Sequence, residues 1–169
     1  MKLFRWIKHA YQRIKRGYSY QDLWSIYDWF FLTLPNMLDD FANEEEIGVP
    51  ANLVLKAEKE HPELSSDERD ELAFKEWREK CKQIAHHLRE AYEPKEQINE
   101  FEDELFGWSK SDDFKFFDDD NNELTLTTTK DPELEKKWIK REEEIYKYQK
   151  AELKKGMEML TENIWDLWW

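Results

Sequence analysis

Cationic, aromatic and hydrogen-bonding side chains concentrate between residues 8 and 27, and this is the strongest chemical signal in the chain. Arginines and the first turn of a helix can hold a phosphate group, and aromatic rings can stack on a base. The combination predicts a site for a small anionic ligand that bears a ring, of the nucleotide type. The candidate ligand-binding residues are Lys8, Arg13, Arg16, Tyr18, Ser19, Asp22, Trp24 and Tyr27.

The same residues also have a purely structural interpretation. Arg16 and Asp22 would then pair with each other or with acids of the third main helix, and the rings would belong to the core. The sequence leaves both interpretations open.

Other motifs that could carry chemistry fail on spacing. The acidic run Asp118–Glu123 suggests a calcium loop, but the sixth and twelfth positions, which need Gly and Glu, hold Glu123 and Thr129. Glu58 and His61 have the spacing of a di-metal helix motif, but no second Glu-x-x-His exists in the chain. We therefore predict no metal site and no cofactor.

Catalytic residues are equally hard to find. His86 and His87 are adjacent on a predicted helix surface, and Cys81 lies in an apolar seam, where a buried packing role is expected. No glycine-rich phosphate loop is present, and no nucleophile–base set can be placed. The chain is therefore predicted not to be an enzyme.

Charge is distributed very unevenly. The net charge of the 169 residues is −13, which does not suit a sequence-specific nucleic-acid binder. The first 21 residues carry six cations and no carboxylate, so the rest of the chain sums to −19. This asymmetry indicates either docking of a basic helix on acidic ones or a basic site on an acidic body.

Leader and membrane signals are absent from the sequence. The basic beginning of the chain lacks the continuous apolar segment of a signal peptide, and no apolar run approaches the roughly 18 residues of a membrane span. The single cysteine fits a reducing compartment. We expect a cytoplasmic location without a membrane span.

Residues 2–16 are predicted to form an amphipathic helix that ends at Gly17. One interpretation is a first bundle helix that buries its apolar stripe in the core. The alternative is a helix that lies in a membrane interface. The stripe consists of Leu3, Ile7, Ala10 and Ile14, with Phe4 and Tyr11 beside it.

The next helix is predicted to begin at Ser19, with Asp22 at the spacing of a shortened capping box, and to continue to about residue 43. Pro35 lies within its apolar pattern, so a kink or a break is expected near Leu34.

Three further helical segments precede residue 107. A short helix is expected over 51–61 and a smaller one over about 95–106. The third main helix is expected to begin with a capping box, in which Ser65 or Ser66 is the cap and Glu68 or Glu71 returns the bond. It carries the clearest heptad seam, formed by Phe74, Trp77, Cys81, Ile84 and Leu88.

The remainder of the chain is expected to be an acidic loop followed by a long helix. The loop spans about 109–130 and is expected to be mobile, with a small hairpin as one conformation. Asp131 and Pro132 begin a helix that could reach the end of the chain. The candidate partner-interface residues are Phe114, Phe116, Phe117, Trp165, Trp168 and Trp169.

Together these elements predict an all-α fold. We expect a helical bundle of about four main helices with a kinked central helix, and a single domain over residues 1–169.

The motifs, taken in order, resemble a group of uncharacterised small helical proteins of tailed bacteriophages and prophages. The strongest correspondence is Arg16-Gly17-Tyr18-Ser19-x-x-Asp22-x-Trp24. The resemblance extends to Gly48-Val49-Pro50, Glu76-Trp77 with Ile84-Ala85 and Leu88, Gly156-Met-Glu-Met-Leu160, and Leu167-Trp168. The charged segment 57–72 and the acidic loop 109–123 depart from it. The resemblance implies a phage origin, and hence the host bacterial cytoplasm, but no established activity.

Three functions fit this sequence. The preferred one is a phage counter-defence protein that sequesters a small anionic, nucleotide-type ligand. The second is an acidic inhibitor or adaptor that binds a host defence protein through the loop. The third is a phage structural or assembly protein that forms a homo-oligomer through its tryptophan-rich end.

Overall fold

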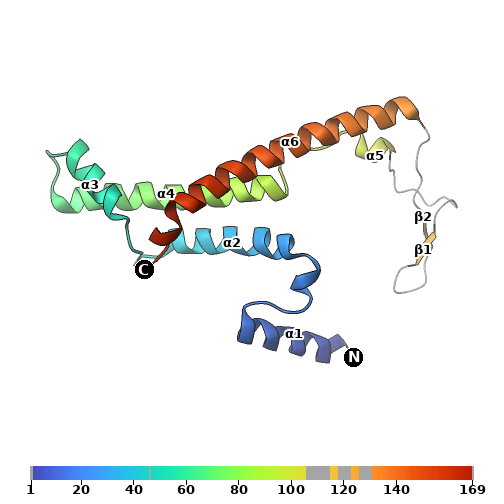
Figure 1. Ribbon diagram of the computed structural model, residues 1–169, viewed down its shortest axis with the longest axis horizontal. Helices are drawn as coiled ribbons and strands as arrows, with labels where there is room; N and C mark the ends of the chain where they lie inside the picture. Colours follow the sequence, from blue (N-terminus) through green and yellow to red (C-terminus); the bar gives the residue numbers. More distant parts are fainter. Residues whose placement is uncertain (1, 46, 106–114, 118–122, 126–130, 169) are drawn as a thin grey trace. The chain divides into compact units, whose positions relative to one another are not determined.

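The computed structural model of the chain describes residues 2–45, 47–105, 115–117, 123–125 and 131–168, and these are predominantly helical, as predicted. This part of the chain contains six α-helices, two short 3₁₀ helices and two strands. The α-helices and strands are labelled in Figure 1. The α-helices are α1 (Lys2–Arg16), α2 (Ile26–Asn43), α3 (Ala51–Glu60), α4 (Ser66–Tyr92), α5 (Glu102–Leu105) and α6 (Pro132–Asn163). The 3₁₀ helices are η1 (Asp22–Trp24) and η2 (Ile164–Asp166), and the strands are β1 (Lys115–Phe117) and β2 (Glu123–Thr125).

The chain divides into two compact units. The first comprises residues 1–92 and 152–169, and the second comprises residues 93–151. The helix α6 contributes residues to both units. The prediction of a single domain over 1–169 stays a prediction.

The core of the first unit is built on α4. Its predicted seam is confirmed, because the side chains of Trp77, Cys81, Ile84 and Leu88 are fully buried. The half around Trp77 packs against the end of α2 and against α3, and the half around Ile84 packs against Leu38 of α2 and the end of α6. A helix with this seam and neighbours on several sides is the centre of the unit.

A capping box fixes where α4 begins. The backbone N–H of Ser65 donates to the Glu68 carboxylate at 2.9 Å, and the Glu68 N–H donates back to the Ser65 hydroxyl at 3.3 Å. These reciprocal bonds satisfy two backbone N–H groups that would have no partner within the helix itself. The capping box predicted here is therefore confirmed, with Ser65 in the capping position.

The second helix starts later than predicted. It begins at Ile26 instead of near Ser19, because residues 22–24 form the tighter turn η1 and Ser25 has a non-helical backbone. Pro35 lies inside α2, and the helix continues through it to Asn43, so the predicted break is wrong. A kink without a break stays a prediction.

The end of the chain returns to the first unit at two glycines. The N–H of Gly48 donates to the carbonyl oxygen of Trp168 at 3.1 Å, and a Cβ at Gly48 would lie only 2.9 Å from that oxygen. Gly156 of α6 lies against α4, where a Cβ would meet His87 and Leu88 at 3.2 Å. Both positions allow an approach that a larger side chain would obstruct.

In the second unit, the helix predicted over 95–106 is much shorter than expected. Of the described residues 95–105, only Glu102–Leu105 is helical, because the Asn99 side chain accepts from the Phe101 N–H at 3.2 Å and donates to Glu142 at 2.8 Å. At the start of α6, the Asp131 carboxylate accepts from the Glu133 N–H at 2.9 Å, which confirms Asp131 as the capping residue.

The acidic region of the second unit is described only in part. The strands β1 and β2 pair antiparallel, with Phe116 opposite Leu124. Most of the loop predicted over about 109–130 lies outside the described residues.

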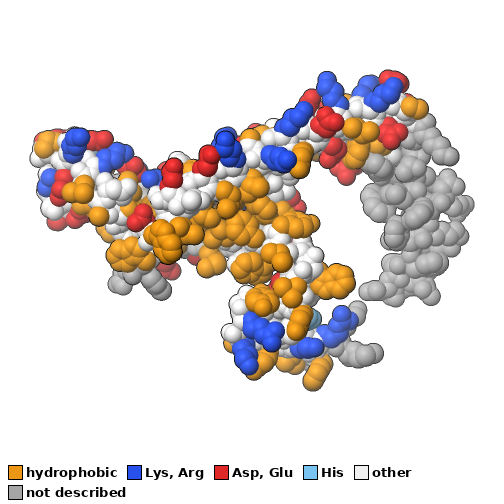
Figure 2. All heavy atoms as spheres, viewed as in Figure 1, with side chains coloured by type: hydrophobic (Ala, Val, Ile, Leu, Met, Phe, Trp, Pro, Cys, Tyr) orange, Lys and Arg blue, Asp and Glu red, His pale blue; other side chains and the backbone are white. Residues whose placement is uncertain are grey.

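Most described side chains of the apolar stripe of α1 and its flank are exposed, contrary to the expectation for a first bundle helix, and only Ala10 among them is partly buried. Phe4 is 78% exposed and Ile14 is 86% exposed, and Ile7 and Tyr11 are also exposed. Figure 2 shows hydrophobic and basic side chains gathered together on this helix.

Candidate functional site

The candidate site is the hinge between α1 and α2. Gly17 ends α1 with a positive φ of 77°, as predicted, and its N–H donates to the Arg13 carbonyl at 2.8 Å. The Ser19 N–H then donates to Asp22 at 2.7 Å, which closes the chain into η1. The side chains of residues 13–24 are therefore held by a turn as well as by two helices.

An ion pair between Arg13 and Asp22 connects the two sides of this hinge. The guanidinium of Arg13 donates through Nη2 to Oδ1 at 2.6 Å and through Nε to Oδ2 at 3.1 Å. These bonds, with the Ser19 N–H, hold the pKa of Asp22 well below its usual range despite a smaller opposing effect of burial. Asp22 therefore pairs with Arg13, which is not among the partners that the structural interpretation of the sequence named.

A second contact strengthens the hinge. Gln12 is buried, and its side-chain oxygen accepts from the Tyr20 N–H at 3.1 Å. Together with the Arg13–Asp22 pair, this contact attaches the polar side of α1 to the segment that follows it.

Two clefts open beside the hinge. The smaller one has a volume of about 280 Å³ and is lined by Arg5, Trp6, His9, Ala10, Arg13 and Gln21. The larger one has a volume of about 660 Å³, and its lining includes Arg13, Gln21, Asp22, Trp24, Asp28 and Trp29. Because Arg13 and Gln21 line both clefts, the two are neighbours.

The electrostatic character of the two clefts differs. Three groups of the smaller one, Arg5, His9 and Arg13, are basic, and no carboxylate is among the described residues that line it. Within the described part of the chain, neither Arg5 nor Arg16 forms an ion pair with a carboxylate. The larger cleft carries two carboxylates and two indole rings, and Trp24 there is 93% exposed. This arrangement suits an anionic group in the smaller cleft and a ring in the larger one.

The structure places the predicted ligand-binding residues in three groups. Arg13, Asp22 and Trp24 line a cleft. Ser19 is fully buried, so its hydroxyl is withdrawn from the surface, and the sequence did not indicate this. The side chains of Lys8, Arg16, Tyr18 and Tyr27 are exposed on the same part of the unit, and Arg16 lies over the Tyr20 ring at 5.8 Å.

Several cleft residues were missed by the sequence reasoning. Arg5 and Trp6 belong to the basic helix but lie before the predicted site, which begins at Lys8, and Trp29 lies beyond its last residue, Tyr27. Helical spacing of Arg5, His9 and Arg13, which are four residues apart, is the signal that could have found the smaller cleft. No sequence signal singled out Gln12 or Gln21.

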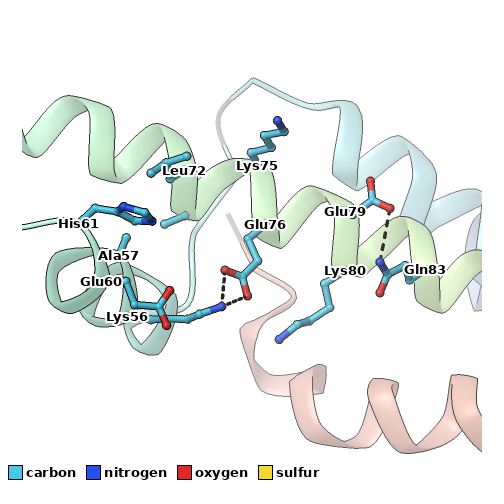
Figure 3. A pocket seen from close by; sticks show the side chains of 11 residues that line it. Lys56, Ala57, Glu60, His61, Leu72, Lys75, Glu76, Glu79, Lys80 and Gln83 are labelled. Carbon is cyan, nitrogen blue, oxygen red and sulfur yellow. Dashed lines mark hydrogen bonds and ion pairs between the residues drawn. The ribbon is translucent and has the colours of Figure 1, made fainter. Parts of the chain in front are cut away.

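A third cleft lies between α3 and α4, with a volume of about 460 Å³. Figure 3 shows Lys56 bridging to Glu76, with both carboxylate oxygens of Glu76 within 2.9 Å of the ammonium. His61, Glu60 and Lys80 also line it. Its cations and carboxylates are mixed, so the cleft shows no preference for one sign of charge.

Cys81 and His87 both lie in contacts that hold the fold together. Burial raises the pKa of the Cys81 thiol to about 11, which disfavours the nucleophilic thiolate. The ring of His87 is 2.6 Å from the carboxylate of Glu152, which also accepts from Lys155 at 2.6 Å. Burial alone would raise the pKa of Glu152, but these hydrogen bonds outweigh it and lower that pKa. His87 therefore connects α4 to α6, where the sequence suggested only a surface pair.

The predicted partner-interface residues are only partly described. The side chains of Phe114, Phe116, Phe117 and Trp169 lie outside the described ones. Trp165 is 90% exposed, whereas Trp168 contacts Gly48. Leu167 packs against both halves of the core, around Trp77 and around Ile84. In the described residues, no cluster of potential metal ligands occurs and no helix is long and apolar enough to cross a membrane.

Comparison of the chain with protein-family models, with curated proteins and with solved structures finds no match to any of them. Whatever function is assigned must therefore come from the geometry of the chain itself.

Proposed function

We propose that the chain is a non-enzymatic binding protein that sequesters a small anionic ligand of the nucleotide type at the α1–η1 hinge. The observation that carries the proposal is the pair of neighbouring clefts, one basic and free of carboxylates, the other lined by Trp24 and Trp29. Phosphate groups would bind Arg5 and Arg13, and the base would stack on an indole ring.

A counter-defence role for a phage or prophage protein is part of this proposal. It rests on the order of motifs from Arg16-Gly17-Tyr18-Ser19 to Leu167-Trp168, which resembles that of small phage proteins. A protein that only binds its ligand can remove a nucleotide signal without any catalytic group, and this agrees with the inert surroundings of Cys81.

The site can be tested with two tryptophans that are equally exposed. Trp24→Ala removes the stacking surface beside the clefts, and Trp165→Ala removes a ring exposed to 90% in η2, which lines neither cleft. We expect Trp24→Ala to weaken nucleotide binding by roughly ten- to a hundredfold and Trp165→Ala to leave it unchanged. Calorimetry over a panel of cyclic, linear and ADP-ribose-type nucleotides measures both.

The charge requirement has its own control. Arg5→Gln removes a cation from the smaller cleft, and Lys140→Gln removes one from the exposed surface of α6. The first change should weaken binding, and the second should not. The proposal is wrong if no nucleotide binds, or if both arginine and lysine variants weaken binding equally through net charge.

A second candidate function is favoured by the exposed ring of Trp165. An indole exposed to 90% near the end of the core is an apolar anchor suited to a protein interface. A structural or assembly role would then involve a homo-oligomer joined through this end. Light scattering should show an oligomer that Trp165→Ser dissociates, and a monomeric wild-type chain would exclude this candidate.

An acidic inhibitor of a host protein is the remaining candidate. Its predicted contacts through Phe114, Phe116 and Phe117 have no side-chain description, so it stays a prediction. Deletion of residues 110–122 should abolish capture of the host protein under this hypothesis and spare nucleotide binding under the first.

A further inference from the structure

The helix α1 is attached to the first unit by its polar side. Gln12, which is buried against the Tyr20 backbone, and Arg13, which pairs with Asp22, make the contacts. On a helical projection, with 100° between successive residues, these side chains lie away from the apolar arc. The apolar stripe therefore faces outward, which is the reverse of the usual arrangement of a surface helix.

The outward stripe is continuous along the helix. Phe4, Ile7, Tyr11 and Ile14 follow one another at steps of three, four and three residues, and all are at least half exposed. Trp6 borders the stripe and is also exposed. An apolar face of this length is costly to leave in water, so it is expected to have a partner.

Lysines border the stripe on its other edge. Lys8 lies one turn after Phe4, and Lys15 lies one turn after Tyr11, so each ammonium can extend past the rim of the apolar arc. No carboxylate occurs in the first 21 residues, which carry six cations. The face is therefore apolar in the middle, with Trp6 on one edge and lysines on the other.

Charge decides between the occupants of this face. A second copy docked stripe to stripe would bring two six-cation segments together, and their repulsion opposes that dimer. An anionic bilayer surface satisfies both features at once, because it accepts apolar side chains below the headgroups and lysines among them.

We propose that α1 binds an anionic membrane surface, lying in its plane with Phe4, Ile7, Tyr11 and Ile14 inserted. The acidic remainder of the chain would be repelled from that surface and held away from it by the hinge at Gly17. Binding is expected to be reversible and to weaken with salt, since one helix of 15 residues supplies all of it. This inference does not rest on the nucleotide site, which uses the side of α1 that carries Arg5, His9 and Arg13.

The test is sedimentation of the full chain with lipid vesicles. One set contains phosphatidylcholine alone, and in the other about one lipid in four is phosphatidylglycerol. The wild-type chain should sediment only with the anionic vesicles and dissociate as salt is raised. A chain that stays in the supernatant with both sets, or that binds the two equally, overturns the proposal.

Variants separate the apolar from the cationic contribution. Ile7→Ser with Ile14→Ser should abolish sedimentation, whereas Ile98→Ser with Ile139→Ser, two exposed isoleucines elsewhere, should not change it. Lys8→Gln and Lys15→Gln keep the stripe intact and should each weaken binding about fivefold. The lysine variants keep the proposal testable if the serine variant fails to form the helix, which circular dichroism would reveal.

The remaining outcomes also decide. Equal binding by the Ile7/Ile14 variant and its control would overturn the proposal. Light scattering that shows a wild-type dimer, dissociated by Ile7→Ser with Ile14→Ser, would assign the face to a second copy of the chain instead.

Discussion

Two helices of this protein carry apolar stripes at the same spacing, yet only one of them is buried. In α4, four seam residues from Trp77 to Leu88 have no exposed surface, while the stripe of α1 from Phe4 to Ile14 lies open. The difference lies in the neighbours. The seam of α4 is covered by α2, α3 and the end of α6, whereas α1 contacts its own unit through Gln12 and Arg13. Periodicity therefore identifies the apolar face of a helix but not what covers it.

The strongest way to test this comparison is to truncate one isoleucine in each helix. Ile84 is fully buried and Ile14 is 86% exposed. We expect Ile84→Ala to lower the free energy of unfolding by about 2–5 kcal/mol, because it leaves a cavity, and Ile14→Ala to change it by less than about 0.5 kcal/mol. Urea denaturation followed by circular dichroism measures both.

A large cost for Ile14→Ala would contradict the comparison. It would mean that the stripe of α1 is buried against the protein after all, and the membrane proposal would fail with it. The same pair of variants should show the opposite order in vesicle binding, where only Ile14 is expected to contribute.

The contrast between α1 and α4 also shows which features of the fold could be predicted from the sequence. The local signals at Gly17, at Ser65 with Glu68, and at Asp131 are confirmed, because a cap or a turn depends on residues three or four positions apart. The seam of α4 is also confirmed, because its apolar residues recur at one helical spacing and therefore lie on a single face of the helix. Local and densely patterned features are therefore predictable from this sequence.

Features that depend on contacts across the chain were not predictable. The Ser19 N–H donates to Asp22 at the predicted capping spacing, but the pairing of Asp22 with Arg13, nine residues away, was not indicated, and the helix begins only at Ile26. The burial of Ser19, the clefts that Arg5 and Trp6 line, and the pairing of His87 with Glu152 have the same origin. A candidate site formed by a turn is therefore harder to predict than the helices beside it.

A smaller effect is expected where the end of the chain contacts the core. Gly48→Ala would place its Cβ at 2.9 Å from the Trp168 carbonyl oxygen and at 3.0 Å from the Trp168 ring, which is closer than van der Waals contact. The free energy of unfolding should therefore fall by about 1–3 kcal/mol. Gly17→Ala, in the hinge, has open space around it and should cost about 1–2 kcal/mol through its positive φ alone.

Shortening the chain distinguishes these two causes. In a chain that ends at Leu167, Gly48→Ala should lose most of its cost, since the obstructing residue is gone, while Gly17→Ala should keep it. If Gly48→Ala costs as much in the shortened chain as in the full chain, the two changes are additive. Gly48 would then be required for its backbone conformation and not for its contact with Trp168. Thermal and urea unfolding of the full and shortened chains, each as the parent, Gly48→Ala and Gly17→Ala, give the comparison.

The carboxylate of Glu152 makes the connection between α4 and α6 sensitive to pH. Its pKa lies below the usual value of 4.5, so its contribution to stability is present above that pH and is lost as the pH falls through the lower value of the folded state. Glu152→Gln should cost about 1–2 kcal/mol at neutral pH and progressively less below pH 4.5. The exposed Glu158, which forms an ion pair with Lys154 at 3.7 Å, is the control, and Glu158→Gln should change little at any pH. A cost for Glu152→Gln that does not vary with pH would exclude this role for its charge.

The smallest effect on stability, and the most informative one for function, is expected at the Arg13–Asp22 pair. The arginine is largely exposed, and pairs of this kind contribute at most about 1 kcal/mol, so Asp22→Asn should scarcely change the unfolding of α4 and its neighbours. In the clefts, however, it removes the negative charge closest to Arg13. If Arg13 binds an anionic ligand, Asp22→Asn should tighten the binding of a mant-labelled adenine nucleotide by about two- to fivefold, most clearly at low salt. If the pair serves only to attach α1, the same variant should loosen that helix, lower its helical signal and leave nucleotide binding unchanged or absent. Fluorescence titration and circular dichroism of one variant therefore distinguish a ligand site from a structural hinge.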